Sequence, residues 1–266
     1  MSPSSKKIIL VMGATGNQGR SVVEHCPAAG HEVYAYIRNP TSAAATQLVQ
    51  QGATLVPGDL NSDVPTLRFA MVTSGITAVF LFEVLTGNWA VDLERTRNII
   101  RAAREAPTVK HVILSTAITT GSHESFPRWG DEYPMRKYRL NKHCDGGKLL
   151  PSMNAITFPG LEQKDDRVLS VGYRPGTKLP WVDIHDMGLA VAAAVGNPAQ
   201  YSHQAIDLAT EALRTQQLAD KLGRALSKAK GNEGKEKPVK VKIQYWSEDE
   251  LNERIRARYP GAAAVR

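Results

Sequence analysis

The sequence predicts an α/β fold: a doubly wound parallel sheet with helices on both faces, followed by a small C-terminal α+β region. Short apolar runs rich in β-branched residues alternate with longer amphipathic stretches over the first 158 residues. A regular strand–helix–strand order requires parallel strands, because right-handed crossover helices then cover both faces of the sheet. A glycine-rich turn directly after the first apolar run supports this fold, since it marks the passage from a strand into a helix.

The expected elements follow this alternation. Strands are expected at residues 8–13, 32–37, 54–57, 78–82, 109–115 and 154–158. The amphipathic stretches between them predict helices at residues 18–29, 41–51, 64–73, 92–106 and 134–150. Strands buried on both faces read as nearly continuous hydrophobic runs. The segments VFLF at 79–82 and HVIL at 111–114 have this composition, as a parallel sheet requires.

The alternation weakens after residue 158. Proline and Pro-Gly pairs predict a loop-rich section up to about residue 181. Helices are expected again at residues 186–195, 215–227 and 248–258, and short strands near 205–208 and 239–245. The sequence therefore divides into segments 1–158 and 159–266.

Composition and charge exclude several classes of protein. Among 266 residues there are two cysteines, Cys26 and Cys144, and no CxxC pair; this argues against a disulfide framework or a zinc knuckle and favours a reducing compartment. The formal net charge is +7, but the basic residues are dispersed, so no nucleic-acid partner is expected. No apolar run has the length of a signal peptide or a membrane span. We therefore expect a cytoplasmic protein without a membrane partner.

The glycine-rich turn predicts a phosphate-binding site. Gly13, Gly16 and Gly19 are spaced by three residues in VMGATGNQGRSVV. In a strand–turn–helix unit, the first glycine permits the tight turn, the second lets the backbone approach a pyrophosphate, and the third lets helix and strand pack closely. The helix dipole then attracts the phosphate. The alternative is a glycine-rich turn that binds no ligand.

Arg38 decides which dinucleotide is expected. An acidic residue at the end of the second strand would bind a ribose 2′-hydroxyl, whereas an arginine accommodates a 2′-phosphate. The second strand ends in YIRNP, with Arg38 where the carboxylate would stand. Because a guanidinium binds phosphate in a bidentate manner, we expect NADP(H) rather than NAD(H). The alternative is that Arg38 is only a surface charge.

Several motifs together resemble one known family. These are GATGNQGRSVV, YIRNP, GDL at 58–60, VILSTA at 112–117, YPMRKYRLNKH at 133–143 and WVDIHDMGLAVAAAV at 181–195. The chain resembles the NmrA-like family, atypical short-chain dehydrogenase/reductases related to isoflavone-reductase-like enzymes. The resemblance implies an NAD(P)-binding Rossmann domain at 1–158, while 159–266 would return to the sheet and form a smaller substrate-binding domain. It also implies that Thr15, Asn17 and Gln18 lie at the pyrophosphate and Asp59 and Leu60 near the adenine.

A tyrosine and a lysine in YRLNK are the candidates for catalysis. Tyr138 and Lys142 share one face of the expected helix. In short-chain reductases this pairing lets the lysine activate the phenol and hold the nicotinamide ribose, and a serine fixes the substrate oxygen. Ser115 and Ser125 are both candidates for that serine, as is Ser122. The alternative for Tyr138 is a helix residue that packs against the core.

The remaining candidates concern the substrate and metals. Trp129 and Tyr133 stand in the loop before this helix, where aromatic side chains either wall an apolar pocket or anchor the loop by burial. The sequence has FPG at 158–160 where relatives read RPG, and a short 160–181 region, so the substrate itself is not specified. His25-Cys26 and His143-Cys144 each resemble half a metal site, but neither recurs at ligand spacing, and no metal is expected.

Together these features predict an NADPH-dependent oxidoreductase that reduces a small carbonyl compound or conjugated double bond. The family also contains cofactor-binding regulators without catalysis. The alternative is therefore a redox-sensing protein that binds NADP(H) and a partner protein. A homodimer is compatible with either function.

Overall fold

The computed structural model describes residues 6–82, 86, 88–116, 150–151, 167–172, 174–202, 204, 206, 208–229 and 239–258. The chain forms two compact units. The first consists of Met1–Met153 and Asp183–Leu208, and the second of Asn154–Val182 and Ala209–Arg266. The segment that begins at Asp183 therefore belongs with the N-terminal sheet. Among the described residues, no helix combines the length and the apolar character needed to span a bilayer.

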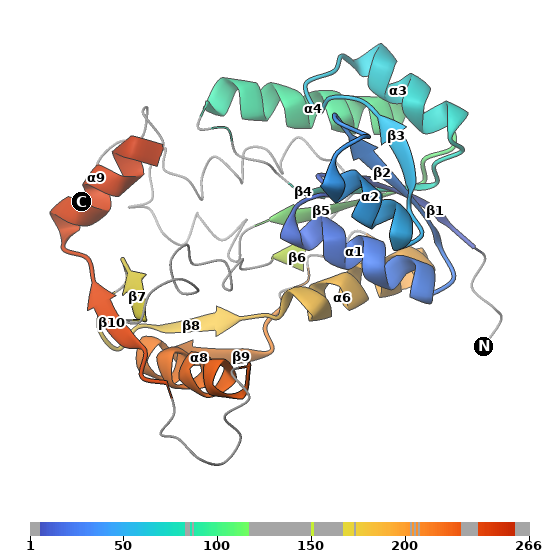
Figure 1. Ribbon diagram of the computed structural model, residues 1–266. Helices are drawn as coiled ribbons and strands as arrows, with labels where there is room; N and C mark the ends of the chain where they lie inside the picture. Colours follow the sequence, from blue (N-terminus) through green and yellow to red (C-terminus); the bar gives the residue numbers. More distant parts are fainter. Residues whose placement is uncertain are drawn as a thin grey trace. The chain divides into compact units, whose positions relative to one another are not determined.

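The first unit is built on a six-stranded sheet in the order β3-β2-β1-β4-β5-β6 (Figure 1). All neighbouring strands are parallel. The strands are β1 (Ile8–Met12), β2 (Glu32–Ile37), β3 (Thr54–Pro57), β4 (Ala78–Phe82), β5 (His111–Thr116) and β6 (Leu150–Pro151). The chain winds outward from β1 in one direction and then in the other, which confirms the doubly wound, Rossmann-like fold.

Helices cover both faces of this sheet (Figure 1). They are α1 (Asn17–Ala28), α2 (Ala43–Gln50), α3 (Val64–Thr73), α4 (Trp89–Glu105), α6 (Ile184–Gly196) and the short α7 (Pro198–Tyr201). Successive residues of a strand point to opposite faces. In β1, Ile9 and Val11 pack in one core with α1, α2 and α6, while Leu10 and Met12 pack in a second core with α3 and α4. The two cores explain why these strands are apolar throughout.

In the second unit, the described residues form two small sheets and two helices. Strand β7 (Val168–Val171) pairs in parallel with β10 (Lys242–Tyr245), and β8 (Lys178–Trp181) pairs antiparallel with β9 (Glu211–Arg214). Helices α8 (Thr215–Ala229) and α9 (Glu248–Arg258) complete it. Its buried core is small and includes Leu169, Val171, Ala219 and Val241.

The elements of the first unit match the sequence-based expectations closely. Strands β2, β3 and β4 and helix α3 have the predicted bounds. The predicted start of the helix at residue 186 was two residues late, because Asp183 is the N-cap of α6 and its carboxylate accepts a hydrogen bond from the His185 amide.

Three expectations in the second half were wrong. A strand was expected near 205–208, but Ile206 and Leu208 lie outside any strand and β9 begins at Glu211. The predicted loop section contains β7 and β8. Leu150 lies in β6 rather than at the end of a helix. Strands of two to four residues carry little periodic signal, which explains these errors. The strand expected at 154–158 and most of the helix expected at 134–150 lie outside the described residues.

Candidate functional site

The turn after β1 is shaped by glycine. Gly13 has a φ of 74°, a conformation that side chains with a Cβ rarely adopt. Its carbonyl oxygen accepts a hydrogen bond from the Gly16 amide at 3.0 Å, which closes the turn. A Cβ on Gly19 would overlap the Gly13 carbonyl oxygen and lie 2.6 Å from the Ala14 Cα. The turn therefore requires glycine at both ends, and it brings the first residues of α1 against the end of β1.

The N-terminus of α1 has no side-chain cap. Gly16 is the N-cap residue, in an extended conformation, and it makes no side-chain hydrogen bond to the helix. A helix start of this kind presents backbone amides and the positive end of the helix dipole. Together with the turn, it has the chemistry of an anion-binding site.

A cavity of about 330 Å³ opens beside this turn, at the carboxyl ends of β1, β2 and β3. It is lined by Gly13, Thr15, Tyr36, Ile37, Arg38, Asn39, Ser42, Gly58, Asp59, Leu60, Asn61, Thr86 and Arg95. In open α/β sheets, ligands bind outside the carboxyl ends of the strands, where the strand order reverses. Strand β1 lies at that reversal, between β2 and β4. The fold therefore places this cavity at its expected ligand-binding position.

Arg38 follows β2 at the rim of the cavity. Its side chain is 76% exposed, and its Nε lies 3.9 Å from Oδ2 of Asp59, which is also exposed. An ion pair of this length between exposed groups is weak. The guanidinium can therefore turn toward an anion in the cavity without losing a strong contact.

The loop after Arg38 is held by its own polar side chains. The Asn39 carboxamide oxygen accepts hydrogen bonds from the Thr41 amide at 3.1 Å and from the Thr41 hydroxyl at 2.8 Å. The Ser42 hydroxyl donates to the Asn39 carbonyl at 2.9 Å, and its oxygen accepts from the Ala45 amide, so that Ser42 is the N-cap of α2. These bonds fix the path of the chain beside Arg38.

Tyr36 forms a wall of the cavity. Its ring is buried against Gly58, where a Cβ would overlap the ring. Its hydroxyl donates to the Ser62 hydroxyl oxygen at 3.4 Å. The sequence analysis predicted neither Tyr36 as a cavity residue nor the contact of its ring with Gly58. The glycine of GDL, directly after β3, could have indicated such a close contact.

A polar network around the buried Arg95 and Asp92 adjoins the cavity. The Arg95 guanidinium donates to the Asn61 carboxamide oxygen from Nε at 3.0 Å and from Nη2 at 2.8 Å, and its Nη1 lies 3.8 Å from the Asp92 carboxylate. Asp92 in turn accepts from the Thr86 amide at 3.1 Å and from its hydroxyl at 2.7 Å. Helix α4 thereby anchors two of the segments that line the cavity. Sequence reasoning missed this network because Arg95 and Asp92 are charged residues within an amphipathic helix, where exposure is the usual expectation.

The cavity brings together five of the predicted cofactor-binding residues: Gly13, Thr15, Arg38, Asp59 and Leu60. Four more, Gly16, Asn17, Gln18 and Gly19, lie in the turn and the first turn of α1. The tenth, Lys142, lies outside the described residues. The proposed roles of these ten residues toward a cofactor stay predictions.

Ser115 is the one predicted catalytic residue within the described part. It lies near the end of β5 and is buried. Strand β4 pairs with both β1 and β5, and the two registers align these strands. Ser115 lies one residue farther toward the carboxyl edge of the sheet than Met12, at the height of the glycine turn. Two strand spacings separate it from β1, about 10 Å. Tyr138, Lys142, Ser125, Trp129 and Tyr133 lie outside the described residues.

The geometry fits an anionic dinucleotide. A glycine turn and an uncapped helix start suit a pyrophosphate, and the adjoining cavity, with Arg38 at its rim, is at the small end of ligand pockets, which begin at about 300 Å³. The cavity walls combine an aromatic ring, an apolar side chain and polar groups. That is the composition expected for the adenosine half of such a ligand.

Comparisons with known proteins agree with this architecture. The nitrogen metabolite repression protein nmrA of Emericella nidulans is 25% identical over 238 residues, which cover 84% of this chain and 66% of that protein, just under two thirds of its length. Two solved structures share the fold. Triphenylmethane reductase of Citrobacter sp., complexed with NADP(H), is 20% identical, with a TM-score of 0.63 over 94% of this chain and 83% of that one. Isoflavone reductase is 20% identical, with a TM-score of 0.61 over 97% and 83%.

The family is shown by a match along most of the sequence. The profile of the NmrA-like family matches residues 5–257, which include the glycine turn, the cavity and the second unit as far as residue 257, within α9. This confirms the resemblance found in the sequence motifs. The chain belongs to the NmrA-like family.

Proposed function

We propose that this protein is an NADPH-dependent oxidoreductase that reduces a small carbonyl compound or a conjugated double bond. The observation that carries the proposal is the cavity beside the glycine turn, which has Gly13 at one side and the weakly paired Arg38 at its rim. A dinucleotide with an additional phosphate matches both features.

Different residues would bind different parts of the cofactor. The turn from Gly13 to Gly19 and the start of α1 would hold the pyrophosphate. Arg38 would bind the 2′-phosphate, because a guanidinium pairs with phosphate through two parallel hydrogen bonds. Asp59 and Leu60 would contact the adenosine side, and Tyr36 offers an aromatic wall there.

The comparisons support this proposal at a coarser level. Triphenylmethane reductase shares the fold and binds NADP(H) in its crystal structure, and isoflavone reductase shares the fold as well. A reductase is therefore a natural function for this architecture, while the substrate is particular to each protein.

The chemistry rests on residues of the second half of the Rossmann domain. When bound, the reduced nicotinamide supplies a hydride to the substrate. Tyr138 would donate a proton to the substrate oxygen. Lys142 would orient the cofactor ribose and stabilise the tyrosinate that remains, which makes the tyrosine a stronger acid. Ser115 or Ser125 would hold the substrate oxygen. Trp129 and Tyr133 would line an apolar substrate pocket. Ser115 is near the carboxyl edge of the sheet at the level of the turn, which is compatible with this role.

Calorimetric titration with NADPH and NADH tests the cofactor assignment. A charge-assisted bidentate contact contributes about 1.5–3 kcal/mol, so Arg38→Ala should weaken NADPH binding by roughly 10- to 100-fold and leave NADH binding nearly unchanged. Arg68→Ala is the matched control, because Arg68 is an exposed arginine that donates to the Glu105 carbonyl, outside the cavity. Equal weakening of both nucleotides by Arg38→Ala would refute the 2′-phosphate assignment.

A second function is favoured by one relative. The Emericella protein is named for nitrogen metabolite repression, so we keep as the alternative a regulator whose binding to a partner protein depends on its NADP(H) occupancy. Affinity capture with the immobilised full chain, in NADPH and then in NADP⁺, tests it. A partner that is retained in only one redox state supports the regulator, and indifference to the cofactor contradicts it.

A further inference from the structure

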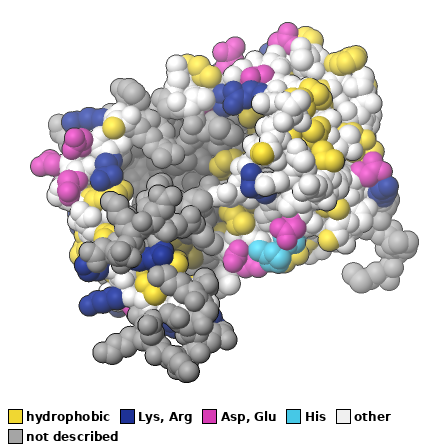
Figure 2. Space-filling model, viewed as in Figure 1, with side chains coloured by type: hydrophobic (Ala, Val, Ile, Leu, Met, Phe, Trp, Pro, Cys, Tyr) yellow, Lys and Arg dark blue, Asp and Glu magenta, His cyan; other side chains and the backbone are white. Residues whose placement is uncertain are grey.

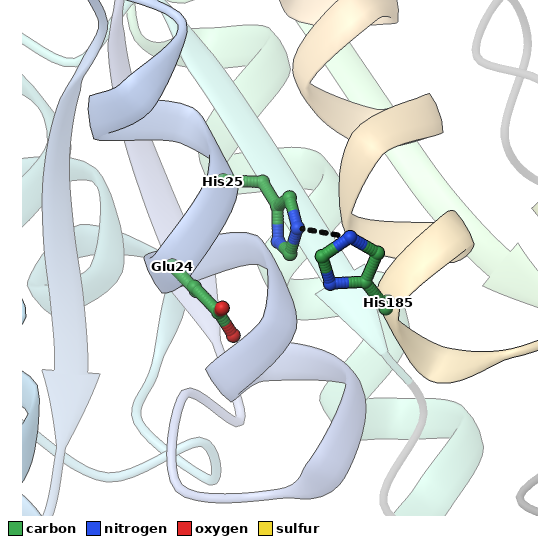
Figure 3. Close-up of side chains that lie close together, drawn as sticks. All are labelled: Glu24, His25 and His185. Carbon is green, nitrogen blue, oxygen red and sulfur yellow. Dashed lines mark hydrogen bonds between the residues drawn. The ribbon is translucent and has the colours of Figure 1, made fainter.

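Two histidines meet between α1 and α6, away from the cavity. His25 comes from the last turns of α1 and His185 from the first turn of α6. Their Nε2 atoms are 3.3 Å apart, and the rings are nearly perpendicular, at 82°. Figure 3 shows the two rings facing each other, with Glu24 on the adjacent position of α1. The ligating atoms of Glu24, His25 and His185 all lie within 4.8 Å of one another.

The hydrogen bonds of His25 determine which nitrogen carries its proton. Its Nδ1 lies 2.8 Å from the carbonyl oxygen of Ser21. Because a carbonyl only accepts hydrogen bonds, Nδ1 is the protonated nitrogen, and Nε2 directs a lone pair toward His185. An imidazole that donates its other N–H to a backbone carbonyl is the usual arrangement for a metal-ligating histidine.

The separation of the two nitrogens suits a tetrahedral metal ion. Zinc–imidazole bonds are about 2.0–2.1 Å long, and at a tetrahedral angle this places two ligating nitrogens about 3.3 Å apart. The Nε2 atoms of His25 and His185 have this separation. A hydrogen bond between the rings, with His185 as donor, has the same length. The experiments below distinguish this hydrogen bond from metal coordination.

The site is held in place by the helices themselves. The Ser21 hydroxyl donates to the carbonyl of Ile184 at 2.7 Å, which ties the start of α6 to α1. Gly188 permits the close approach, since a Cβ there would overlap the Ser21 hydroxyl and lie 2.8 Å from His25 Nδ1. Asp183 caps α6 through the His185 amide. These contacts fix the backbone from which both histidines project.

The third ligand and the surroundings are acidic. Glu24 is exposed, so that its side chain can turn toward the two nitrogens. Figure 2 shows one histidine-coloured patch at the surface with acidic side chains beside it, and such a setting attracts a cation. The neighbouring Cys26 is buried and does not belong to this cluster.

We propose that Glu24, His25 and His185 form a binding site for a divalent transition-metal ion of the zinc type, with water at the fourth position. Two imidazoles and a carboxylate are a known ligand set for such ions. The bound ion would join α1 to α6 and stabilise the first unit. This inference is independent of the proposed reductase function. Sequence spacing could not reveal the cluster, because 160 residues separate the two histidines.

Calorimetry with zinc chloride tests the site on chelator-treated, tag-free protein. We expect His185→Ala to abolish one equivalent of zinc binding and Glu24→Gln to weaken it by about tenfold or more. His185 and Glu24 are exposed, so both variants should fold, which circular dichroism verifies. Asp183→Asn is the matched control: it removes a nearby negative charge, keeps all three ligands and keeps the helix cap, and it should bind zinc like the wild type.

Two further measurements separate coordination from a hydrogen bond between the rings. Cobalt(II) should give the visible absorption of a four-coordinate ion in the wild type and lose it in His185→Ala. Zinc should raise the melting temperature of the wild type and not that of His185→Ala. Zinc binding that is the same in His185→Ala as in the wild type, or absent from the wild type, would overturn the proposal and leave a histidine pair joined by a hydrogen bond.

Discussion

Gly19→Ala is the substitution that tests the construction of the turn most severely. The added Cβ would overlap the Gly13 carbonyl oxygen and lie 2.6 Å from the Ala14 Cα and 2.9 Å from the Gly13 carbonyl carbon. All three are backbone atoms, so no side-chain rotation relieves the overlap. Either α1 or the turn must move by about 1 Å to restore an ordinary contact.

The magnitude follows from two opposing effects. Overpacking of a closely packed site costs about 1–3 kcal/mol, and here the upper end applies because the obstructing atoms belong to the backbone. Alanine is a better helix residue than glycine, which returns up to about 1 kcal/mol. We therefore expect a net loss of about 2 kcal/mol in the free energy of unfolding. The displaced turn should also weaken NADPH binding.

Urea denaturation, followed by circular dichroism, measures this loss. Gly16→Ala is the matched control, because a Cβ there would lie 3.3 Å from the same carbonyl oxygen and the backbone is extended at a φ of −77°; it should cost less than about 1 kcal/mol. A Gly19→Ala protein that is as stable as the Gly16→Ala protein would refute the packing explanation.

Three further predictions concern other parts of the molecule. Arg95→Met should lower the free energy of unfolding by at least about 2 kcal/mol, because it removes two hydrogen bonds to Asn61 and leaves the buried Asp92 without its cation; a loss below about 0.5 kcal/mol in urea titrations would contradict the network. Burial raises the pKa of Cys26 from 9.0 to about 12, so the unfolded chain releases this proton first and stability should fall as the pH rises from 9.0 toward 12. Cys26→Ala should show a shallower decline in the same range, and identical slopes would show that the thiol makes no such contribution. Tyr138→Phe should abolish turnover and preserve NADPH binding under the reductase proposal, whereas full activity on a genuine substrate would exclude the tyrosine as proton donor.

The N-terminal half was predictable because its central strands contribute to a core on each face of the sheet. Strands such as β4 are apolar on both faces, and the turns between elements are marked by glycine or by capping residues such as Ser42 and Asp63. Gly13 and Arg38 could be assigned to one site because each follows a predicted parallel strand, and parallel strands end at one edge of the sheet. Asp59 was assigned to that site by the family resemblance.

The remaining features depend on contacts between distant residues. Tyr36 forms a cavity wall only because Gly58, on another strand end, leaves room for its ring. The ring contact of His25 with His185 likewise depends on the packing of α6 against α1. The short strands of the second unit pair in twos. Strand β10 lies within the strand expected near 239–245, whereas β7, β8 and β9 are too short to be distinguished from loops by their pattern.

The cavity beside the glycine turn is proposed to bind NADP(H) with its 2′-phosphate at Arg38. A crystal structure of the full chain with NADP⁺ tests this proposal directly. We expect the pyrophosphate at the start of α1 and the 2′-phosphate within ion-pair distance of the Arg38 guanidinium. A nucleotide bound elsewhere, or a 2′-phosphate that points away from Arg38 into solvent, would contradict it.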